Sequence, residues 1–235
     1  MPDRTASAAS PDLLPELVAA ALRAGADAAE AVTAERASLS VGVRNGALED
    51  VEREESRDLG LRVFIGRRQA TVSASDLSDA TRARLVERAV AMARLAPEDP
   101  YAALAPQDRL AHGPFPELDL FDPAERSAAE LEAAAAETEA AAMAVPGVAK
   151  SEGGHASASS SRWRLVTSHG FDGAYHGSAF SLGVGVIAEK DGAMERGGEH
   201  RAVRHLSDLP SAASIGDDAG RRAVARTGPR KIDST

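Results

Sequence analysis

Aliphatic residues alternate with small or polar residues along several long segments of this chain, and this pattern constrains the fold most. Every second residue is apolar from Leu59 to Ile65 and again from Phe180 to Ala188. Because successive side chains of a strand point to opposite faces, each segment has one apolar face and one polar face. The pattern therefore predicts long strands that pack one side against a core.

Turn signals between these segments predict antiparallel connections in the first half of the chain. A strand carrying Leu39, Val41 and Val43 leads into Asn45-Gly46, a dipeptide that two-residue hairpins favour. We expect a returning strand, then a third strand over 59–65, a turn at Gly66, and a fourth strand from Ala70 to Ser75. One helix should enter at Ser10-Pro11 and end at Gly25; another should begin at Ser78 or Asp79 and close at Pro97.

The second half repeats this order. Ser127 and Glu130 have capping-box spacing and predict an alanine-rich helix that runs to Pro146-Gly147. We expect strands over 148–159, 162–168 and the long segment ending at Ala188, with turns at His169-Gly170 and Asp191-Gly192. After a return strand, a weak helix should open at Pro210-Ser211 and be interrupted by Gly216 and Gly220.

The two halves resemble a degenerate internal duplication. Ser75-Asp76-Leu77 and Ser207-Asp208-Leu209 each stand just before an expected helix. The predicted fold class is α+β, with two degenerate helix–antiparallel meander–helix units that form curved antiparallel sheets flanked by helices. The expected organisation is a flexible N-terminus (1–10), a first αββββα unit (11–96), a proline-rich connector (97–126) and a second αβ unit (127–235).

Composition limits the partners and the compartment. The chain has 235 residues, 27 Lys and Arg against 36 Asp and Glu, and a formal net charge of −9, so direct binding of nucleic acid is not expected. There is no cysteine, which excludes disulfides and thiolate metal sites from this segment. No signal peptide and no apolar run of membrane-spanning length is present, so we expect a cytoplasmic protein without a membrane partner.

No metal motif is found among the histidines. The six are His112, His155, His169, His176, His200 and His205, and no two are spaced with a glutamate as on a zinc-binding helix. The nearest approach to a site is the group Glu195, Glu199, His200 and His205, in which the two histidines are five residues apart and should point in different directions. We interpret this group as exposed hairpin residues and predict no metal ligands.

Other chemistry-bearing residues also have plainer explanations. Ser151 and the serines from Ser157 to Ser161 lack a nucleophile elbow and suit the polar face of a strand. Gly183 and Gly185 lie inside an alternating strand, where close backbone packing or a narrow channel wall explains them better than a dinucleotide loop. Glu54 and Glu55 belong to a charged run that reads as a solvated hairpin face. No catalytic residue is predicted.

Several longer strings resemble the N-terminal region of the TldD/PmbA family, closest to its TldE/PmbA branch. They are AGADAAE at 24–30, EREESRDLGLRVFIGRRQATVSASDLS at 52–78, AMARLAPEDPY at 91–101, LDLFDP at 118–123, 148–151 with Glu152-Gly153, and 167–186 with Ser168-His169-Gly170-Phe171. The resemblance spans nearly the whole chain. It marks Arg57, Gly60, Arg62, Gly66, Ser73 and Ser75 as family-motif positions with an expected structural role.

The resemblance implies a subunit of the TldD/TldE metalloprotease, which acts on unfolded peptides in the cytoplasm. It also implies a dimeric protein, a TldD-like partner that carries the zinc, no cofactor in this segment, and a family C-terminal domain that would begin near the last residues given. The segment itself is then expected to be non-catalytic. An alternative is a regulatory protein-binding module, because family members were earlier described as modulators of DNA gyrase.

Overall fold

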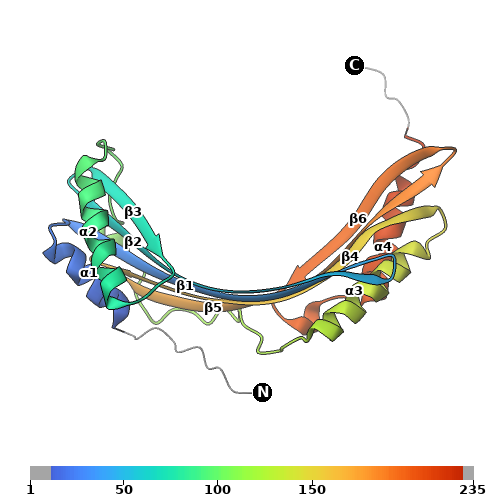
Figure 1. Ribbon diagram of the computed structural model, residues 1–235, viewed down its shortest axis with the longest axis horizontal. Coiled ribbons are helices and arrows are strands. Elements are labelled where there is room, and N and C mark those ends of the chain that lie inside the picture. Colours follow the sequence, from blue (N-terminus) through green and yellow to red (C-terminus); the bar gives the residue numbers. More distant parts are fainter. Residues whose placement is uncertain (1–11, 230–235) are drawn as a thin grey trace, which may run out of the picture. The chain divides into compact units, whose positions relative to one another are not determined.

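The computed structural model describes residues 12–229, and the expected flexible N-terminus and the Ser10-Pro11 helix entry lie outside this range. Within it the chain forms four α-helices and six strands (Figure 1). In chain order they are α1 (Leu13–Arg23), β1 (Ala28–Arg44), β2 (Ala47–Ile65), β3 (Arg68–Ala74), α2 (Asp79–Leu95), α3 (Ala128–Met143), β4 (Val148–Thr167), β5 (Asp172–Lys190), β6 (Ala193–Val203) and α4 (Ala212–Ala225). The predicted α+β class is confirmed.

The strands form one antiparallel sheet in the order β3-β2-β1-β4-β5-β6. The predicted hairpin turns are present, since Asn45 and Gly46 have φ of 53° and 74° and Asp191 and Gly192 have φ of 52° and 79°. Two successive residues with positive φ make the type I′ turn that matches the twist of paired strands. Each half of the chain thus contributes one three-stranded meander, as the internal duplication predicts.

Two details of the strand prediction are wrong. The returning strand and the separate third strand are one continuous element, β2, so the first half has three strands and not four. The two short strands expected at 148–159 and 162–168 are likewise one strand, β4. Charged residues in β2 and serines in β4 resemble loop sequence, but these parts of the two strands are exposed or half-buried, so solvent accommodates the polar side chains without breaking the strands.

The residues cluster into two compact units, and β1, β2, β4 and β5 each contribute to both. The first unit holds α1 and α2, and its core consists of aliphatic side chains from these helices and from β1, β2, β3 and β4. Leu14, Leu59 and Leu61 are among its largest fully buried side chains. Ser78 caps α2 by accepting the N–H of Thr81, as predicted.

The second unit holds α3 and α4, which pack on each other and on the sheet. The predicted capping box is present at the start of α3, with Ser127 and Glu130 bonded to each other's backbone N–H. The prediction of a helix interrupted by glycines is wrong, because α4 is continuous. A Cβ on Gly216 would lie 2.3 Å from the carbonyl oxygen of Thr138, so this glycine lets α4 approach α3 closely.

A buried carboxylate fixes the tip of the β1–β2 hairpin in the second unit. Glu139 on α3 is 3% exposed and accepts 2.8 Å hydrogen bonds from the backbone N–H of Asn45 and of Gly46. The Ser151 hydroxyl also donates to it. Three donors satisfy the charge, for which residues 12–229 provide no paired cation, and they tie the turn to the helix.

Candidate functional site

The structure separates the residues that came closest to a metal site. Glu199 is buried and pairs with Arg201 and with Arg222 of α4, whereas the rings of His200 and His155 stack on each other. His205 Nε2 lies 2.9 Å from the carbonyl oxygen of Asp119. Within residues 12–229, no group of three His, Cys, Asp or Glu side chains could hold a metal ion. The interpretation of this group as exposed hairpin residues is wrong for Glu199.

Side chains from β4 and β6 meet over glycines of β5. The rings of His155 and His200 are 5.4 Å apart between centroids and 16° from parallel. A Cβ on Gly183 would lie 2.8 Å from Cε1 of His155, so a larger residue would separate them. Two residues further, Arg196 and Glu152 form an ion pair of 2.5 Å beside Gly185. The two glycines therefore make room for cross-strand pairs, which agrees with their expected close-packing role.

The same segment carries hydroxyls that bond to one another. The Oγ atoms of Ser157 and Ser181 lie 2.7 Å apart across β4 and β5. Burial lowers the pKa of His155, and the charge of His200 lowers it further. A neutral His155 could act as a base, but its stacked neighbour is another imidazole, and no hydroxyl is bonded to it within the described chain. The arrangement is that of a polar sheet surface.

Part of the proline-rich connector is hydrogen-bonded to the segment after β6. The carboxylate of Asp122 accepts the backbone N–H of Leu206 and of Ala124, and these bonds lower its pKa. Phe121 stacks on His176 with 3.5 Å between ring centroids. In the other unit, Tyr101 is 90% exposed, whereas the buried Leu104 packs against Phe64.

The family-motif positions lie on the β2–β3 hairpin of the first unit. Arg57 Nε is 2.9 Å from Glu35, and Arg62 Nη2 is 2.7 Å from Glu30. The Ser75 hydroxyl donates to Asp58 at 2.8 Å. Gly60 pairs with Ser73 in the β2–β3 register, and Gly66 takes φ of 56° in the turn. These contacts connect neighbouring strands, and the structural role of the six positions stays a prediction.

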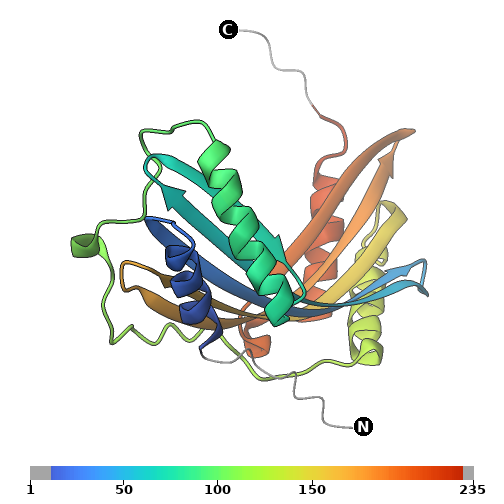
Figure 2. The same ribbon diagram turned by 60° about the vertical axis from the view of Figure 1, so that its left-hand side comes forward.

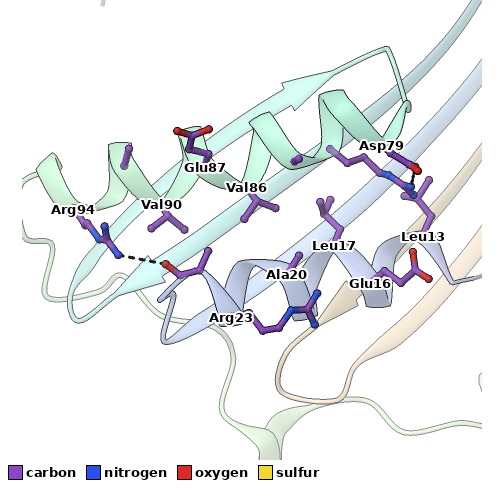
Figure 3. Close-up of a pocket in the computed structure, with 14 residues that line it drawn as sticks. Leu13, Glu16, Leu17, Ala20, Arg23, Asp79, Val86, Glu87, Val90 and Arg94 are labelled. Atoms are coloured by element: carbon purple, nitrogen blue, oxygen red, sulfur yellow. Dashed lines mark hydrogen bonds and ion pairs between the residues drawn. The ribbon is translucent and has the colours of Figure 1, made fainter.

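A groove of about 890 Å³ runs between α1 and α2 in the first unit (Figure 3). Leu17, Val86 and Val90 lie between the two helices, and Arg94 donates a hydrogen bond to the carbonyl oxygen of Ala24. Glu16 and Arg23 on α1, with Asp79, Arg82 and Glu87 on α2, add charge to its lining. Nothing in the sequence signalled this groove, because its apolar residues are the same ones that build the core.

Both halves of this architecture match family descriptions. Residues 29–93 match domain 1 of the PmbA/TldA metallopeptidases, and residues 121–227 match the central domain of the same family. The chain belongs to the PmbA/TldD family. The predicted resemblance is therefore confirmed.

Named relatives agree with this assignment. The chain is 35% identical to metalloprotease PmbA of Escherichia coli O157:H7 over 226 residues, which are 94% of this chain and 50% of that protein. Two solved structures share the PmbA/TldD fold. One, named as a modulator of DNA gyrase from Bacteroides thetaiotaomicron, has a TM-score of 0.86 at 19% identity, covering 94% of this chain and 51% of that one. The other, TldE from Thermococcus kodakarensis, has a TM-score of 0.70 at 16% identity, covering 89% and 47%.

The chain spans about half the length of the relatives that it matches. In the part of the chain that the structure describes, no helix combines the length and apolar character needed to cross a membrane.

Proposed function

We propose that this chain is the scaffold portion of a TldE-like subunit, which works with a zinc-bearing TldD-like partner on unfolded peptides in the cytoplasm. The observation that carries the proposal is the match to both domain 1 and the central domain of the PmbA/TldA metallopeptidases. The relative named metalloprotease PmbA supports a place in proteolysis.

The chemistry of the described residues supports a non-catalytic role. Glu199 pairs with Arg222, whereas His200 stacks on His155, and the hydroxyl of Ser157 bonds to that of Ser181. Sheet strands that carry hydroxyls, glycines and ion-paired side chains make a surface along which an extended chain can lie. The proposed role is therefore to shape access to a zinc centre in the partner.

The proposal is tested with the full-length subunit, its zinc-bearing partner and a disordered peptide. We expect cleavage from the mixture and none from either subunit alone, measured by mass spectrometry of the products. Cleavage by the partner alone at the rate of the mixture would remove the proposed role. As a control, the partner is also mixed with the Glu139→Ala subunit, in which the fold of the scaffold is destabilised. This mixture tests whether cleavage depends on a folded scaffold.

A second candidate is a regulatory binding module, favoured by the neighbour named as a modulator of DNA gyrase. The net charge of −9 argues that such regulation would run through protein contacts and not through DNA. A stable partner complex whose effect survives zinc chelation supports this alternative. An effect that disappears with the zinc supports the protease.

A further inference from the structure

The outer edge of β2 is unpaired over the part that belongs to the second unit. β3 pairs with β2 only from Leu59 to Ile65, and no other described strand lies on that side of β2. Residues 47–55 are all exposed. Their outward backbone N–H and C=O groups are therefore available to an added strand.

This edge is held in a defined shape. The turn that begins β2 is bound by Glu139 through the N–H groups of Asn45 and Gly46, and Arg44 and Glu49 form an ion pair of 3.1 Å next to it. Figure 2 shows the β1–β2 hairpin beside α3. A fixed strand edge loses little conformational freedom when another strand pairs with it, which favours binding.

The charges on the edge select the kind of strand that fits. Asp50, Glu52 and Glu54 are alternate residues, so they share one face of β2 at a spacing of about 7 Å. None of the three forms an ion pair with another described residue, whereas neighbouring Arg53 is paired with Glu55 at 2.7 Å. Three unpaired carboxylates in a row match an extended chain with a basic residue at every second position.

We propose that the free edge of β2 from Ala47 to Glu55 binds an extended polypeptide by strand addition, and that it prefers segments with lysine or arginine at alternate positions. This inference rests on the proposed function, because it names the class of unfolded chain that the scaffold holds. A second copy of the same edge is a poor occupant, since it would set carboxylates opposite carboxylates.

Two fluorescent peptides of equal composition test the proposal with the full chain. One alternates lysine with threonine, and the other places all its lysines together. We expect the alternating peptide to bind more tightly in fluorescence anisotropy. The variant D50N/E52Q/E54Q should weaken its binding about tenfold, whereas E117Q/E125Q/E137Q, which makes the same change in net charge at exposed sites, should not.

Amide hydrogen exchange separates strand addition from simple charge attraction. The alternating peptide should slow exchange at residues 47–55, because added backbone hydrogen bonds protect amides. Equal binding of both peptides, an unaffected triple variant at the edge, or unchanged exchange in these residues would each overturn the inference. If the inference is overturned but cleavage still requires the subunit, the proposed function stands. If the alternating peptide binds the edge as expected but cleavage does not need the subunit, only the proposed function fails.

Discussion

The carboxylate of Glu139 on α3 accepts the backbone N–H of Asn45 in the turn between β1 and β2, at 2.8 Å. The same carboxylate accepts the N–H of Gly46 and the hydroxyl of Ser151. Glu139→Ala removes three hydrogen bonds to a buried carboxylate, and we expect it to lower the free energy of unfolding by about 2–3 kcal/mol. Chemical denaturation measures the loss. Glu137→Ala, on the exposed side of the same helix, should change stability by less than about 0.5 kcal/mol.

A second prediction concerns the contact of α4 with α3. Gly216→Ala should lower the free energy of unfolding by about 1–3 kcal/mol, because the added Cβ would lie 2.3 Å from the carbonyl oxygen of Thr138. On an exposed helix the same change stabilises by about 1 kcal/mol, so the sign of the effect is diagnostic. Asp218→Ala at an exposed position of α4 is the control. Thermal melts compare the variants, and a more stable Gly216→Ala protein would contradict the packing.

The elements that sequence predicted well are those whose signals are local. Asn45-Gly46 and the Ser127–Glu130 pair specify a turn and a helix start through contacts between near neighbours, and both are present. The missed features depend on distant partners. In sequence, Gly216 predicts a break in the helix, and only its contact with Thr138 explains why a glycine is needed there. No local pattern predicts that Glu139 binds a turn more than ninety residues away.

The candidate site shows the same difference between local signals and contacts with distant residues. Sequence predicted no metal ligands, and it gave no sign that His155 and His200 meet, because they stand on strands separated by β5. Gly183 within an alternating strand is the available signal; it predicts close packing but does not identify His155 as the neighbour. Placing Glu199 on an exposed hairpin was wrong, since its pairing with Arg222 depends on where α4 lies.

A third prediction is a pH-dependent contribution from His205. Its hydrogen bond with the backbone of Asp119 raises its pKa, and the charges of Asp119, Asp122 and Asp208 raise it further. A raised pKa means that the folded state favours protonated His205. This stabilisation is fully present below about pH 6.5, the value of an unperturbed histidine, and is lost as pH rises through the raised pKa. Unfolding curves of the wild type and of His205→Gln at several pH values should therefore differ most at acidic pH. A stability difference between the two proteins that does not change with pH would contradict the predicted contribution of His205.

The fourth prediction concerns the stacked histidines. Burial lowers the pKa of His155, and the charge of His200 lowers it further. His200→Gln removes the second cause, so the pKa of His155 should rise but stay below that of an exposed histidine. NMR titration of the imidazole signals measures the pKa of His155, and His112→Gln is the control because His112 is exposed and belongs to the first unit. Because the folded state disfavours protonated His155, its contribution to stability is present above about pH 6.5 and is lost as pH falls through the lowered pKa, opposite to His205. An unchanged pKa in His200→Gln would show that the two rings do not sense each other's charge.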